Sequence, residues 1–167
     1  MNKIISLFLG LFVALPGTSV LAEPGLLAEL TQDKVLRLQY SPYTLHYSPS
    51  AEHKHVVMLG VERESANAGL DGVTLFSNSF GQTTLYLYPW GHIYKSVGGV
   101  QGLAFKWTAG LLYGYRQPYE NKVPMNYNGF SPAVIPAVVY EFQSGWSVQA
   151  NILGTAGMMF QLSAPLK

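Results

Sequence analysis

The sequence predicts an all-β protein, an eight-stranded antiparallel transmembrane β-barrel with a short N-terminal amphipathic helix or arm. Of the 167 residues, 49% are hydrophobic, 13% are aromatic and only 11% are charged, whereas a soluble domain carries about 25% charge. This composition excludes a disordered chain. A net charge of +1 does not indicate the strongly basic surface that is typical of nucleic-acid-binding proteins. The absence of Cys excludes disulfides, Cys-bound metal and thiol nucleophiles.

The N-terminal residues have the pattern of a secretory signal peptide. Lys3 precedes an uncharged apolar run from Ile4 to Leu15, and Val20-Leu21-Ala22 forms a small-x-small cleavage site. The run is shorter than the about 20 residues that span a bilayer, which disfavours an uncleaved anchor helix. We therefore expect residues 1–22 to be removed on export, leaving 23–167 as the barrel domain, with an amphipathic helix or arm over 24–33.

Alternation with a period of two predicts the strands and the direction of their faces. In the segment 103–116, Leu103, Phe105 and Trp107 share one face, while Lys106 and Thr108 lie on the other. A soluble β-sandwich exposes charged residues on the outer faces of its sheets. A barrel in lipid instead has apolar side chains on its outer face and small or polar ones on its inner face. The pattern favours the barrel over the sandwich. The candidate strands are 34–46, 55–63, 72–80, 83–94, 103–116, 131–142, 146–152 and 156–164.

Counting strands assigns each connection to one rim. If the mature N-terminus is periplasmic, the outer loops are 47–54, 77–82, 117–130 and 153–156, and the inner turns are 64–71, 95–101 and 143–145. The longest connection then lies outside, as is usual in such barrels. His46 and the tripeptide Ser77-Asn78-Ser79 meet on this same rim.

These rim residues form a possible acyl-transfer set. A neutral His46 takes a proton from an attacking hydroxyl, the Asn78 amide oxygen fixes its tautomer, and the Ser79 hydroxyl donates to a developing oxyanion. Ordinary turn chemistry explains the tripeptide equally well, and the chain lacks a Gly-x-Ser-x-Gly elbow. His53 and His55 flank Lys54, but two ligands without a third are a weak metal pattern, so we expect neither a metal nor another cofactor.

In this order along the chain, several short segments resemble the lipid A palmitoyltransferase family of the outer membrane. Thr44-Leu45-His46 is similar to the segment around the family's active-site His, and Phe76-Ser77-Asn78-Ser79 to its Phe-x-Asp-Ser segment. Residues 106–110 (Lys-Trp-Thr-Ala-Gly) and the spacing of Pro132 and Pro136 with Tyr140 resemble its later strands. The segment 24–33 matches its periplasmic amphipathic helix.

The resemblance implies a monomeric acyltransferase in the outer membrane of a Gram-negative bacterium, which moves a palmitoyl chain from a phospholipid to lipid A. His46 is then the base and Ser79 the hydroxyl that assists the oxyanion. Asn78 occupies the position of the family's Asp; Asn orients an imidazole, as in Cys-His-Asn sites, but does not electrostatically stabilise the imidazolium.

The remaining predicted substrate contacts lie on strand six, where the resemblance implies them, and on the outer rim, where cationic side chains suggest them. Pro132, Pro136 and Tyr140 belong to a lateral lipid gate, where prolines weaken the strand ladder. Arg116, with Lys54 and Lys122, is expected to meet lipid A phosphates. The residues alone leave two other functions open: a non-enzymatic barrel for solute transport or membrane interaction, and a soluble sandwich that binds an apolar ligand.

Overall fold

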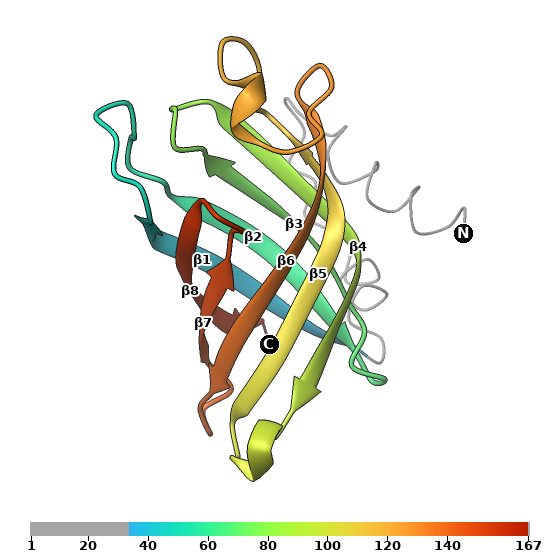
Figure 1. The fold of residues 1–167 in the computed structure, drawn as a ribbon. Coiled ribbons are helices and arrows are strands. Elements are labelled where there is room, and N and C mark those ends of the chain that lie inside the picture. Colours follow the sequence, from blue (N-terminus) through green and yellow to red (C-terminus); the bar gives the residue numbers. More distant parts are fainter. Residues whose placement is uncertain (1–33, 167) are drawn as a thin grey trace, which may run out of the picture. The chain divides into compact units, whose positions relative to one another are not determined.

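The computed structural model describes residues 34–166 and confirms the predicted barrel. Eight antiparallel strands pair in chain order, and β8 closes the barrel on β1 (Figure 1). The predicted signal peptide 1–22 and the predicted helix or arm over 24–33 lie outside the described residues. Within the described part of the chain, no helix is long and apolar enough to cross a membrane. The elements are β1 (Lys34–His46), β2 (Met58–Ser65), β3 (Leu70–Ser77), β4 (Thr83–Lys95), η1 (Val97–Gly99), β5 (Leu103–Tyr113), η2 (Glu120–Lys122), β6 (Phe130–Glu141), β7 (Ser147–Ile152) and β8 (Gly157–Pro165).

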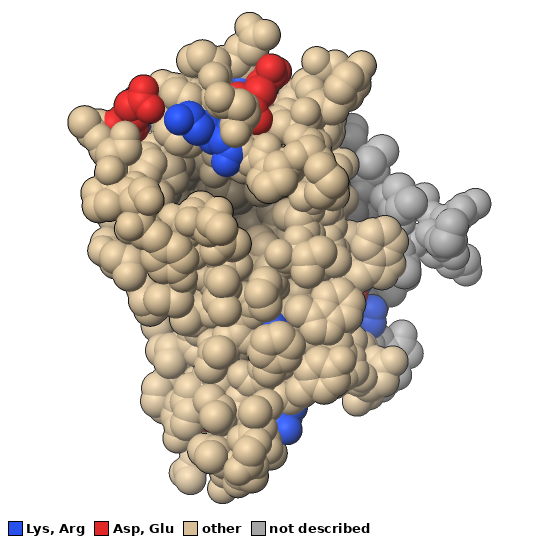
Figure 2. Space-filling view, in the orientation of Figure 1, with Lys and Arg blue, Asp and Glu red and all other residues tan. Residues whose placement is uncertain are grey.

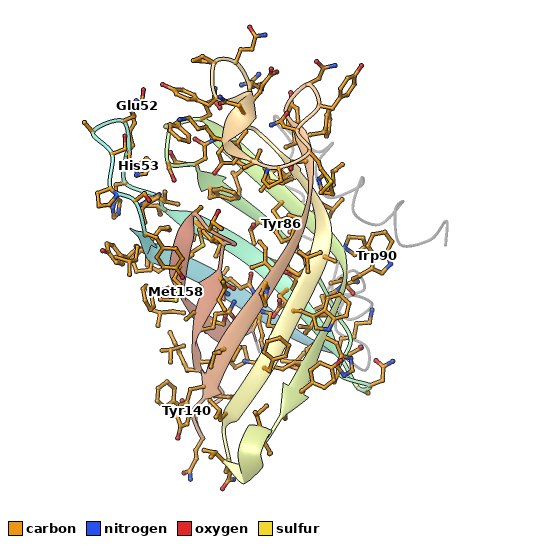
Figure 3. The ribbon with its side chains drawn as sticks, viewed as in Figure 1. Glu52, His53, Tyr86, Trp90, Tyr140 and Met158 are labelled. Atoms are coloured by element: carbon orange, nitrogen blue, oxygen red, sulfur yellow. The ribbon has the colours of Figure 1, made fainter. Side chains whose placement is uncertain are left out.

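The two faces of the strands are divided as the alternation predicts. On β5, Phe105 and Leu111 are exposed, whereas Lys106 and Thr108 are buried inside the barrel. The other strands repeat this division, and labelled side chains such as Trp90 point away from the barrel (Figure 3). The outer surface of the strands therefore carries a band of exposed apolar side chains, including Leu38, Tyr43, Leu59, Leu75, Leu87, Trp90, Tyr94, Phe105, Leu111, Val134, Val138, Tyr140, Phe160 and Leu162.

The connections gather at the two rims that strand counting assigns. We call the end with residues 47–57, 78–82, 114–129 and 153–156 the upper rim, and the end with 66–69, 96–102 and 142–146 the lower rim. The two longest upper connections, 47–57 and 114–129, rise at the top of Figure 1. Within a few residues at each boundary, these are the predicted outer loops and inner turns.

The end of β5 differs from the predicted boundary: the strand stops at Tyr113 instead of continuing to Arg116. Gly114 has a φ of 153° and closes tightly on the neighbouring strand, since a Cβ there would lie 2.5 Å from the Cα of Thr84. A residue with a side chain does not fit this approach. The alternating pattern continues through the glycine, but the strand does not.

The seam between β6 and β7 is open in its upper half. The strands pair only over Ala137–Glu141 of β6, although β6 begins at Phe130. Phe130 bonds Tyr127, away from β5, whereas the N–H of Glu141 donates to Gly102 on the β5 side. Because alternate residues of a strand use opposite edges, Pro132 and Pro136 face the β7 side. Their missing N–H groups therefore lie along the stretch that has no strand partner.

The lower half of the barrel interior is filled by a buried polar network. Lys106 Nζ lies 2.6 and 2.8 Å from the two carboxylate oxygens of Glu62 and donates to Gln149 at 3.2 Å. The hydroxyl of Tyr88 donates to Glu62 at 3.0 Å. Further bonds extend this network to β1, β7 and β8 through Gln39, Asn151, Gln161 and Ser163. These members come from six strands and are buried, so they close the barrel below its middle.

Candidate active site

His46 and Ser79 meet at the upper rim, as strand counting predicts. The Nε2 atom of His46, the last residue of β1, lies 2.6 Å from the Oγ atom of Ser79 in the β3–β4 turn. In the tautomer that carries its proton on Nδ1, the imidazole accepts a hydrogen bond from the serine hydroxyl. This distance is within the range for a nucleophile and its general base.

Asn78 builds the turn that presents Ser79. Its Oδ1 accepts from the backbone N–H groups of Phe80 and Gln82, both at 3.0 Å, and its own N–H donates to the carbonyl of Gln82. The side chain is fully buried, and its Nδ2 has no partner among the described residues. The Asn78 oxygen, which the sequence predicts to orient the imidazole of His46, instead accepts the two N–H groups of its own turn.

A second histidine, which sequence reasoning treated only as part of a weak metal pattern, packs on His46. The rings of His46 and His53 have centroids 4.1 Å apart at an interplanar angle of 32°. The loop 47–57 that carries His53 is tied to the turn, because the N–H of Lys54 donates to the carbonyl of Ser79 at 2.8 Å. Figure 3 shows His53 on this upper loop. The loop therefore covers the imidazole from one side.

Aromatic rings continue from His53 across the upper rim. His53 contacts the edge of Phe80, and Phe80 stacks on Tyr119 with ring centroids 4.4 Å apart. The ammonium of Lys122 lies 5.4 Å from the centre of the Phe80 ring, a cation–π distance. Burial raises the pKa of the nearby Tyr115 hydroxyl to about 12. Three upper connections thus meet around Phe80.

A cavity of about 670 Å³ runs from the His46–Ser79 pair into the barrel, within the roughly 300–1,000 Å³ of typical ligand pockets. Its walls are largely apolar, and it ends below at the pair Lys106–Glu62. Tyr86 points into the barrel interior (Figure 3). On the face in Figure 2, charged side chains gather at the upper rim above a hollow in the surface. The apolar lining residues include Met58, Phe76, Leu112, Ala133, Ile135, Leu153 and Met159.

Thr44, to which the sequence pattern assigns no role, lines the cavity. It lies two positions before His46 on the same inward face of β1. Its hydroxyl is buried and has no hydrogen-bond partner among the described residues. A hydroxyl carries one donor hydrogen, so Thr44 holds an unused donor beside the cavity. Sequence alone offers no signal for this, because the alternation shows only that Thr44 faces inward.

The predicted substrate-binding residues are not all brought together. Pro132 lines the cavity, and Pro136 lies lower on the same unpaired stretch of β6. Tyr140 lies near the lower end of β6, is 43% exposed and points away from the barrel (Figure 3). Arg116 is exposed on the upper rim, where its backbone bonds Gln82, and Lys122 is the rim cation that lines the cavity. Tyr140 therefore lies apart from the cavity, whereas Pro132 and Lys122 belong to it.

In the part of the chain that the structure describes, no three His, Asp or Glu side chains gather in a way that could hold a metal ion. Neither a scan against protein-family models nor a search of curated proteins gives a match to this chain. The geometry of the cavity and its mouth therefore carries the functional argument.

Proposed function

We propose that the protein is an outer-membrane acyltransferase that moves a palmitoyl-type chain from a phospholipid to lipid A. The observation that carries this proposal is the largely apolar cavity with a His–Ser pair at its mouth. The resemblance to the lipid A palmitoyltransferase family supports the choice of lipids. The signal-like N-terminus supports export.

The exposed surface supports a position in a bilayer. Apolar side chains such as Leu59 (57% exposed), Val134 (69%) and Trp90 (65%) face outward from the strands. Burying such a band in hydrocarbon removes it from water, and closure leaves no unpaired sheet edge along most of the wall. A soluble β-sandwich would bury these side chains between two sheets.

The filled lower half favours an acyl pocket over a transport pore. The buried pair Lys106–Glu62 and its polar neighbours bridge the interior between strands on opposite sides. A solute that enters at the upper rim meets this network, whereas an acyl chain needs only the hollow above it. The open upper seam between β6 and β7 offers a side route for a lipid tail, because the cavity touches both Pro132 on β6 and Leu153 after β7.

The chemistry needs a base at the ester. With a phospholipid acyl chain in the cavity, its carbonyl carbon lies near the mouth. His46 Nε2 accepts the proton of the attacking hydroxyl, and the glycerol oxygen that leaves takes that proton. The products are an acylated lipid A and a lysophospholipid. Rim cations such as Lys122 are suited to lipid phosphates.

The direct test is the mass spectrum of lipid A from cells that express the chain. We expect the wild-type protein to add the mass of one palmitoyl group, and His46→Ala or Ser79→Ala to remove that addition. His55→Ala, on an exposed position of the loop that carries His53, is the matched control and should retain it. Heat-modifiable gel mobility confirms that each variant is folded.

Unchanged lipid A in cells with abundant, folded wild-type protein would refute the proposal. Conductance or solute uptake in liposomes that His46→Ala leaves unaffected would favour a non-enzymatic transport barrel instead.

A further inference from the structure

The shortest contact at the mouth of the cavity joins a serine hydroxyl directly to an imidazole. Ser79 Oγ and His46 Nε2 are 2.6 Å apart, and both side chains line the cavity. We propose that Ser79 is the nucleophile and carries the acyl chain as a covalent ester between the two halves of the reaction. This inference rests on the proposed acyl transfer and replaces the oxyanion role that the resemblance implies for Ser79.

Ser79 is held as a rigid nucleophile would be. The Asn78 side chain locks the turn through two backbone N–H groups, and Gly81 provides the left-handed residue with φ of 80° that closes it. The carbonyl of Ser79 accepts from Lys54, so loop 47–57 fixes the residue from a second side. A hydroxyl that only donates a hydrogen bond to an oxyanion keeps its proton and needs no neighbouring base. An attacking hydroxyl needs a base within hydrogen-bond distance to accept its proton.

The imidazole is fixed as well. His46 ends β1, where Tyr47 donates its N–H to Ala156, and His53 packs against the imidazole ring at 4.1 Å. Holding both partners in one geometry before the substrate binds is what makes nucleophilic catalysis effective. The pair therefore meets the requirement for a Ser–His dyad without a third, acidic residue.

The proposed step is balanced in two halves. Ser79 Oγ attacks the ester carbonyl carbon as its proton passes to His46 Nε2; the bond from that carbon to the glycerol oxygen breaks, and the glycerol oxygen takes the proton. The acceptor hydroxyl then attacks the seryl ester, gives its proton to His46, and Ser79 Oγ leaves and regains it. No oxidant or reductant is needed. The unused hydroxyl of Thr44 on the cavity wall is the donor suited to the oxyanion.

The test uses the full-length mature protein in detergent micelles with two probes, a long-chain alkyl fluorophosphonate and a p-nitrophenyl ester of palmitic acid. We expect the fluorophosphonate to label Ser79, as located by peptide mass spectrometry, and the ester to release a burst of nitrophenol that matches the amount of protein. Ser79→Ala should abolish both signals, and His46→Ala should slow labelling at least a hundredfold. Ser77→Ala, at the end of β3 just before the same turn, is the matched control and should be labelled like the wild type.

The outcomes separate this inference from the proposed function. Lipid A acylation that persists in Ser79→Ala, or that proceeds in the wild type without any labelled or acylated Ser79, overturns the covalent mechanism while the transferase stands. Labelled Ser79 with a stoichiometric burst supports the nucleophile even where lipid A is not the acceptor. Double-reciprocal plots of the rate against one substrate, at several fixed concentrations of the other, provide a further test. Parallel lines support the seryl ester, and intersecting lines overturn it.

Discussion

The lower and upper halves of this barrel are built from the same strands but differ in what occupies their interiors. Below the middle, charges are paired, and the pairs Lys106–Glu62 and Arg37–Glu64 are buried on both sides. The exposed Lys95 and the partly exposed Glu141 add a second partner to Glu64 and to Arg37. Above it, the interior is hollow and largely apolar. The rim cations Lys54, Arg116 and Lys122 form no ion pair with any of the described residues.

This difference separates the part that holds the barrel together from the part available to a ligand. A small barrel has room for side chains or for one small ligand, and here each half uses one of these options. The lower network ties six strands to one another across the interior, so the upper half can remain empty and its β6–β7 seam unpaired. The following substitutions should affect the two halves separately.

The largest effect is expected from breaking the ion pair in the lower half. Lys106→Met leaves Glu62, whose side chain is only 4% exposed, as a buried charge without its cation, which costs about 3–5 kcal/mol. Urea unfolding in detergent micelles should show that loss of stability. The double variant Lys106→Met/Glu62→Gln should recover most of it; a single variant as stable as the wild type would show that the network does not hold the lower half together.

A smaller loss of stability, confined to the upper rim, is expected for Asn78→Ala. This change removes the acceptor of two backbone N–H groups in the turn, and unpaired buried donors cost about 1–3 kcal/mol. Acylation should fall with stability, because Ser79 loses its position. Asn78→Asp keeps an oxygen for both N–H groups, so it should retain the turn; if Asn78→Ala retained full activity and stability, the turn would not position Ser79.

Filling the cavity should reduce activity with little change in stability. Ala133 lines the hollow from β6, and Ala133→Phe places a ring where we expect the acyl chain. A loss of at least about tenfold in acylation, equivalent to about 1.4 kcal/mol, should accompany an unfolding free energy near that of the wild type. Val138→Phe, on the exposed outer face of the same strand, is the control. Equal activity in the two variants would exclude this part of the cavity as the acyl site.

The smallest effect is expected from the ring that packs on His46. Aromatic packing of this kind is worth about 0.5–1.5 kcal/mol, so His53→Ala should lower kcat severalfold while KM and stability change little. His53→Phe keeps a ring at the position and should restore kcat. A fall in kcat for both variants would indicate that the imidazole nitrogens of His53, and not its packing, are what matters.

Much of the fold could be predicted because its signals are local. The alternation along β5 places Phe105 outside and Lys106 inside, and this needs only the geometry of an extended strand. Because antiparallel neighbours reverse direction, counting strands was enough to bring His46 and Ser79 to one rim. The end of β5 was missed at Gly114, whose close approach to Thr84 depends on the neighbouring strand.

The sequence by itself determined the closed β architecture, the inward and outward faces, and the rim on which the His–Ser pair lies, since each follows from periodicity and parity. Only the tertiary structure decided the side-chain partners. Lys106 and Glu62 are 44 residues apart, and the oxygen of Asn78 could serve either an imidazole or its own turn. Such choices depend on which groups the closed barrel brings within hydrogen-bond distance, and no local pattern carries that information.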